Sequence, residues 1–107
     1  MKNDEFLRSQ IDRDNDQSFF NLLYHDAFFD EKQLKKIIKI CQKYEIKDVG
    51  LKAKVADIMH LTTFLIACHR DKNDVYKIKN YDKIDEKFND YFQDMREIIT
   101  KFIKENQ

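Results

Sequence analysis

A single glycine and no proline occur among the 107 residues of the chain, and this scarcity is the strongest constraint on its fold. At average usage of ~7% glycine and ~5% proline, a chain of this length would carry about a dozen of the two. Strands in a small sheet protein are joined by many tight turns, and tight turns need these residues. An all-β or doubly wound fold is therefore nearly excluded, and a helical fold is expected.

Apolar residues recur at helical spacing in four segments, the first of them in two pieces. We expect helices over residues 4–11 and 18–29, and then over 30–50, 51–69 and 83–105. Ser18 has the chemistry of an N-cap, and Asp30 with Gln33 has the spacing of a capping box. Gly50 is expected to end the third of these helices or to lie just beyond it. For residues 75–81 the sequence is compatible with either an extended linker or a helical turn.

These segments predict an all-α fold, a compact antiparallel bundle of about four helices that forms a single domain over residues 1–107. The length is that of one domain and leaves no room for two. A homodimer is an alternative, because the 83–105 helix is long and its apolar stripe is wide enough to serve two partners.

No feature of the sequence indicates a membrane segment. The longest unbroken apolar run is five residues, Phe64 to Cys68, whereas a membrane span needs ~20. The first residues lack the apolar core of a secretory signal, so we expect a cytoplasmic protein. Cys41 and Cys68 are expected to be reduced and packed, although a disulfide between them stays open.

Charge is segregated along the chain although it sums to zero. Residues 1–31 hold three basic and eight acidic side chains (net −5), and residues 32–54 hold eight basic and two acidic (net +6). On the 30–50 helix the lysines recur at helical spacing opposite the apolar stripe. This basic face comprises Lys32, Lys35, Lys36, Lys39 and Lys43, followed by Lys47. It predicts binding to an acidic surface of another protein.

Nucleic acid is the alternative ligand for this basic face. Lysines neutralise phosphates in a sequence-independent way. Nucleic-acid-binding surfaces usually add arginine forks or stacking aromatic residues, and this face has neither. Protein is therefore the first hypothesis and nucleic acid the second.

The acidic stretch before Ser18 resembles the front half of an EF-hand loop, because Asp12, Asp14 and Asp16 alternate as calcium ligands do. Gln17 stands where that loop needs glycine, and Leu23 stands where it needs a bidentate glutamate. A solvated acidic loop ahead of a helix explains the three aspartates equally well. We therefore predict no metal site, although cation binding by these aspartates stays open.

A second candidate surface combines aromatic and polar residues of the 51–69 helix with residues of the 75–81 linker. Asp57, His60 and Phe64 fall on the polar half of that helix, and the linker adds Tyr76 and Tyr81. Aromatic residues mixed with charged ones are typical of the centre of protein interfaces. The alternative is that the linker aromatics are covered by the fold.

Nothing in the sequence indicates catalysis. No hydroxyl lies in a nucleophile elbow, and one glycine cannot build a phosphate-cradling loop. We therefore expect a non-enzymatic protein without cofactor that covers a partner's surface: an inhibitor, an immunity or antitoxin-like factor, or a regulatory subunit.

Overall fold

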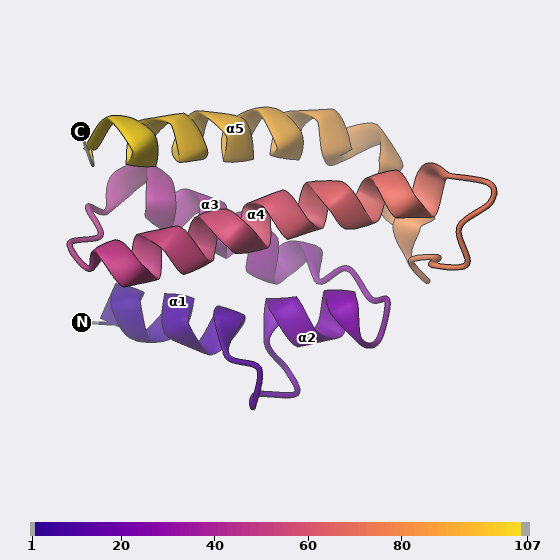
Figure 1. Cartoon of the computed structure of the whole chain (residues 1–107), viewed down its shortest axis with the longest axis horizontal. Helices are drawn as coiled ribbons and strands as arrows, with labels where there is room; N and C mark the ends of the chain where they lie inside the picture. Colours follow the sequence, from indigo (N-terminus) through magenta and orange to yellow (C-terminus); the bar gives the residue numbers. More distant parts are fainter. Residues whose placement is uncertain (1, 106–107) are drawn as a thin grey trace.

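The computed structural model describes residues 2–105, and this part of the chain contains helices and no strand (Figure 1). The predicted all-α helical bundle is confirmed. Its α-helices are α1 (Lys2–Ile11), α2 (Phe19–Tyr24), α3 (Glu31–Lys43), α4 (Val49–Arg70) and α5 (Phe88–Glu105). Two short 3₁₀ turns, η1 (Tyr81–Lys83) and η2 (Asp85–Lys87), precede α5.

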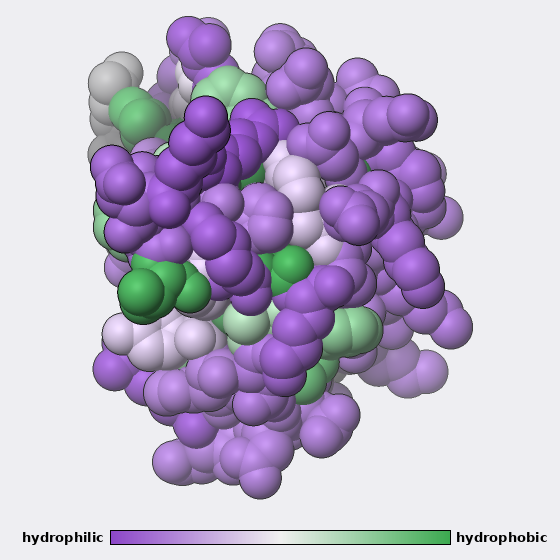
Figure 2. Space-filling model, turned by 90° about the vertical axis from the view of Figure 1, so that its right-hand side faces the viewer, coloured by the Kyte–Doolittle hydropathy of each residue, from purple (hydrophilic) through white to green (hydrophobic). Residues whose placement is uncertain are grey.

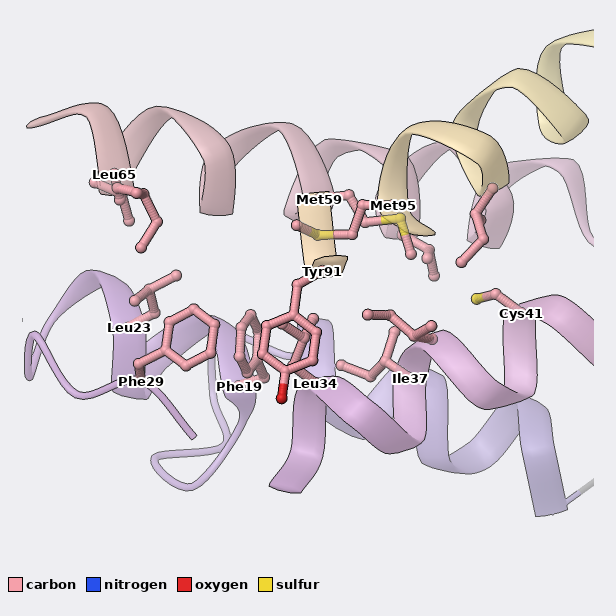
Figure 3. Packing of buried hydrophobic residues seen from close by; sticks show 14 of the residues in the cluster. Phe19, Leu23, Phe29, Leu34, Ile37, Cys41, Met59, Leu65, Tyr91 and Met95 are labelled. Carbon is pink, nitrogen blue, oxygen red and sulfur yellow. The ribbon is translucent and has the colours of Figure 1, made fainter. Parts of the chain in front are cut away.

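The longest helix, α4, occupies the middle of the bundle. In Figure 1 it crosses in front of α3, with α5 above it and α1 and α2 below it. It packs against α1, α2 and α5, whereas α3 packs against α5 and α1. Figure 3 shows apolar side chains of α2, α3, α4 and α5 meeting between the helices, so one core holds all of these elements together.

The helix starts follow the predicted capping chemistry. The Ser18 hydroxyl accepts a hydrogen bond from the Asn21 backbone N–H at 3.0 Å, and Asp30 accepts one from the Gln33 N–H at 3.2 Å. Each cap satisfies a backbone donor that the first turn leaves without a partner. Asp48 caps α4 in the same way, a role that the sequence analysis did not assign.

The predicted helix over residues 18–29 is too long, because α2 ends at Tyr24. Ala27 takes a left-handed backbone conformation with φ of 52°, and this reverses the chain. The reversal brings Phe29 into the core, where its ring meets the edge of Phe19 at a centroid distance of 5.7 Å. Burial of this ring offsets the cost of the left-handed residue.

The prediction for Gly50 is wrong. α3 ends at Lys43, and Gly50 is the second residue of α4 rather than a C-cap. The connection between the two helices buries Ile46 in the core, which an uninterrupted helix would not do at this place. The Lys101 ammonium donates to the Cys41 carbonyl at 3.0 Å and so satisfies an acceptor in the last turn of α3.

The helix predicted over residues 83–105 begins later than expected, at Phe88. Residues 81–87 form the turns η1 and η2 instead, and they bury Ile84. The tighter winding of a 3₁₀ turn lets the chain bend into α5 at this point.

Two loops at one end of the bundle are joined by a side chain. Asn80 accepts a hydrogen bond from the Phe29 N–H at 2.9 Å and donates to the Phe29 carbonyl at 2.8 Å. The Lys79 N–H adds a backbone bond to the Ala27 carbonyl at 2.8 Å. These bonds hold the 25–30 loop to the segment that follows α4, although the two are about 50 residues apart in sequence.

Replacing Asn80 by alanine (Asn80→Ala) should lower the free energy of unfolding by about 2–3 kcal/mol, because the change removes both partners of the Phe29 backbone. The matched control is Asn73→Ala, since Asn73 is exposed on the neighbouring turn. Urea denaturation followed by circular dichroism measures both. Equal stability of the two variants would contradict the role given to Asn80.

Candidate functional site

The lysine face is a continuous basic surface on α3. All five of its lysines, Lys32, Lys35, Lys36, Lys39 and Lys43, are exposed. The buried side of α3 carries Leu34, Ile37, Ile38 and Cys41, so the lysines lie on the side turned away from the core. Eleven residues separate the first lysine from the last, a length of about 17 Å along the helix axis. The structure therefore brings together five lysines of the predicted basic face, whereas Lys47 lies beyond the end of α3 at Lys43 and outside this helix face.

The spacing of these lysines opposes helix formation. Lys32 with Lys36, Lys35 with Lys39, and Lys39 with Lys43 are all like-charge pairs four residues apart. Each such pair destabilises a helix by about 0.2–0.5 kcal/mol. Only part of this charge has a partner close by: Lys35 meets Glu31 of the same helix at 3.9 Å, and Lys36 lies over the Phe6 ring of α1 at 4.2 Å.

Glu31, at the start of α3, belongs to the packing of α3 on α5. A hydrogen bond from the Tyr91 hydroxyl is the main cause that lowers the pKa of Glu31, and the Lys87 ammonium at 3.3 Å lowers it further. Burial and the Glu31 carboxylate raise the pKa of Tyr91. Glu31 therefore stays ionised and is already partnered, so it neutralises little of the lysine face.

The second candidate surface is a groove of about 580 Å³ between α2 and α4, which we call the α2–α4 groove. It contains three of the predicted residues, Asp57, His60 and Phe64, all of them exposed. The α2 side adds Phe20, Tyr24 and His25, which the sequence analysis did not single out as a site. The lining is completed by Arg13, Ile58 and Leu61.

The α2 residues of this groove are held by stacking. The Phe20 and Tyr24 rings are stacked at 5.6 Å, and His25 meets Tyr24 edge-on at 4.9 Å. The Arg13 guanidinium lies over the Phe20 ring, 5.3 Å from its centroid. The sequence signal for this part of the groove was the pair of adjacent aromatic residues Phe19 and Phe20 in a short amphipathic segment. That signal was missed because the helix was expected to continue to Phe29 and to bury more of its aromatic side chains. Chemically, the groove offers an apolar floor with a mixed rim suited to a partner's apolar side chain.

Tyr76 and Tyr81 do not belong to this surface, which corrects their assignment as partner-binding residues. Tyr81 is buried, and its hydroxyl accepts a hydrogen bond from Arg70 Nε at 2.6 Å. Tyr76 is half-buried, and its hydroxyl donates a hydrogen bond to the Leu23 carbonyl. Burial raises the pKa of Tyr76 to about 12. The fold covers Tyr81 and part of Tyr76, as the alternative held, while Val75 is an exposed apolar residue of the linker at 97% exposure.

The end of the molecule that carries the 71–80 segment is mostly hydrophilic, with apolar residues in small separate patches (Figure 2). His69 helps to order this end. Its Nδ1 accepts a hydrogen bond from the Ile78 N–H at 2.9 Å, and its ring lies 4.1 Å from that of Tyr81. Burial lowers the pKa of His69, and the nearby Lys77 ammonium lowers it further.

The acidic loop before Ser18 is organised by hydrogen bonds to its own backbone. The Asp12 carboxylate accepts from the Asp14 N–H at 2.9 Å, and the Asn15 side chain accepts from the Gln17 N–H at 3.1 Å. The Asn21 amide donates to the Arg13 and Asn15 carbonyls, both at 2.8 Å. Within residues 2–105, no group of three or more histidine, cysteine, aspartate or glutamate side chains could hold a metal ion.

Both cysteines are free thiols. Cys41 is fully buried, and burial raises its pKa to about 12. Burial also raises the pKa of Cys68, and the Asp74 carboxylate adds to the effect. A thiol with a raised pKa is a poor nucleophile at neutral pH, so neither side chain resembles a reactive cysteine.

Comparison of the chain with protein-family models, with curated proteins and with solved structures found no match. None of the helices in the described part of the chain is both long and apolar enough to cross a membrane. The lysine face and the α2–α4 groove are therefore the features from which a function can be inferred.

The low pKa of His69 predicts a loss of stability in mild acid. Above its usual pKa of 6.5 the histidine is neutral in both states; as the pH falls below this value the unfolded chain takes up the proton first. The free energy of unfolding should therefore fall between pH 7.5 and 5.5. His69→Gln, which keeps an acceptor but does not titrate, should show a smaller fall.

Denaturation at both pH values measures this difference, and His25→Gln is the control, because His25 is exposed just after α2. The control should lose stability in acid as the wild type does. An identical pH dependence of the wild type and His69→Gln would contradict the assignment.

Proposed function

We propose that this protein is a non-enzymatic interaction factor that binds an acidic surface of another protein through its lysine face and acts by covering that surface. One observation carries the proposal: five exposed lysines lie on one side of α3 in an arrangement that reduces the stability of the helix. A basic stripe of this length can steer an acidic partner and fix its orientation.

The arrangement of charge around α3 favours a protein partner over nucleic acid. The chain has no net charge and a pI of about 6.8, whereas nucleic-acid-binding domains are commonly strongly basic. All the cations of the face are lysines, which offer point charges rather than the planar fork that reads base edges. An inhibitor, an immunity or antitoxin-like factor and a regulatory subunit all fit this mode of action.

The variant Lys32→Glu/Lys39→Glu tests the proposal. It turns each of the three like-charge pairs of the face into an ion pair, so the free energy of unfolding should rise by about 1–3 kcal/mol. Binding to an acidic partner should nevertheless weaken at least about 100-fold at low salt, because like charges would then meet across the interface. Lys72→Glu/Lys79→Glu is the matched control, since it changes the net charge equally at two exposed lysines of the 71–80 segment.

Affinity capture from an extract of the source organism and its natural host, with and without nuclease, identifies the partner. The wild type, the lysine-face variant and the control variant are each used as bait. The proposal predicts a stoichiometric protein that the wild type and the control retain, that the lysine variant loses, and that nuclease does not release. Equal capture by all three proteins would exclude the lysine face. A nuclease-sensitive signal would instead indicate nucleic acid, with log affinity falling linearly with log salt concentration.

A further inference from the structure

α4 leaves one side uncovered by its own chain, on the face turned to the viewer in Figure 1. Exposed residues recur along this side at alternating intervals of three and four, which is the spacing of a helix–helix seam. We call it the α4 outer face, and it comprises Gly50, Ala53, Asp57, His60, Phe64, Ala67 and Asp71, the last just beyond the end of the helix.

The middle of this face carries no charged side chain, and its two aspartates, Asp57 and Asp71, lie on either side of that stretch. Charged residues make up 37% of the chain, yet none occurs between Ile58 and Cys68. The Phe64 side chain, at the middle of the face, is 62% exposed. Small residues on either side of it, Ala53 and Ala67, would allow a second helix to approach closely. A helix that is apolar on most sides is typical of a buried position.

Grooves border the face on both sides. The α2–α4 groove lies on one side, with the half-exposed Tyr24 at its edge. A groove of about 520 Å³ between α4 and α5 lies on the other side, lined by Ala67 and Phe92 among others. A ridge between two grooves is the surface shape into which a second helical ridge packs.

We propose that the α4 outer face binds a second copy of this chain, with the two α4 helices antiparallel across a two-fold axis. Two opposite charges are complementary in this arrangement, because the exposed Lys54 lies at the edge of the face, next to Ala53 near its start, and Asp71 lies at its end. With the axis between residues 62 and 63, each Lys54 lies opposite the other copy's Asp71. A parallel pair would instead place each charge against its own equivalent.

The same register brings aromatic side chains together at the axis. Phe64 and His60 lie about 2 and 4 Å from the axis along the helix, on opposite sides of it. His60 of one copy therefore comes beside Phe64 of the other, and the two contacts repeat by symmetry. An aromatic cluster at the centre with a charged pair at each end has the anatomy of a protein interface.

The size and charge of the molecule suit such a dimer. The side of the bundle that α4 occupies measures 39 by 27 Å, which accommodates the ~800 Å² per partner of a typical specific interface. A chain with zero net charge has no long-range repulsion against its own copy. No lining residue of the two grooves belongs to α3, so a dimer formed here keeps both lysine faces free.

Sedimentation equilibrium from about 1 to 100 μM tests the proposal on the whole chain. The wild type should approach twice the 13.1 kDa mass of the chain as its concentration rises. Phe64→Glu should weaken self-association at least about tenfold without unfolding the chain, because the side chain is already exposed. Val75→Glu is the control, since it places the same charge at a more exposed apolar residue outside the face.

The register has a test of its own. Lys54→Glu should weaken the dimer, because a glutamate would then face the other copy's Asp71, and the swap Lys54→Glu/Asp71→Lys should restore it. A monomeric wild type at all concentrations would overturn the proposal, and so would a Phe64→Glu protein that associates as tightly as the wild type. Failure of the swap to restore association would overturn the antiparallel register. None of these results alters the test of the lysine face, which uses different residues and a different partner.

Discussion

The fold depends on the need of α4 for apolar neighbours around most of its circumference. Leu51, Val55, Met59, Leu65 and Ile66 are all buried, and each such side chain contributes about 1.5–3 kcal/mol when it leaves water. Three helices pack against α4 and supply this burial, α1 and α2 on one side and α5 on the other, and α3 lies behind. The surrounding helices leave the α4 outer face uncovered, and we propose that a second copy of the chain binds there.

Without proline, and with one glycine that lies inside a helix, the chain makes its turns with polar side chains. Asp30 and Asp48 cap helices, Asn21 gathers the carbonyls of the acidic loop, and Asn80 binds both backbone groups of Phe29. Short side chains with hydrogen-bonding groups can mimic backbone partners in this way. The EF-hand likeness therefore has a structural cause at Asp12, whose carboxylate accepts a hydrogen bond from the Asp14 N–H and so serves the loop itself.

Periodicity predicted the helices and the lysine face because both are local properties, set by which side chains lie three and four residues apart. Caps at Ser18 and Asp30 were predictable for the same reason. The early end of α2 and the late start of α5 were not, because each is decided by a distant partner: Phe29 turns inward to meet the core, and Ile84 is buried before α5 begins. The groove could be predicted only in part, since Asp57, His60 and Phe64 share one helix whereas Tyr24 joins them through tertiary packing.

Two surfaces on different sides of one small bundle thus carry the account, with lysines on α3 for an acidic partner and the outer face of α4 for a second copy. The arrangement of the two α4 helices is its central claim, and the most direct measurement is an isotope-filtered NOE experiment on a mixture of labelled and unlabelled chains. The account predicts contacts between the His60 ring of one chain and the Phe64 ring of the other. A fully associated sample that shows no NOE between chains at these rings would contradict it.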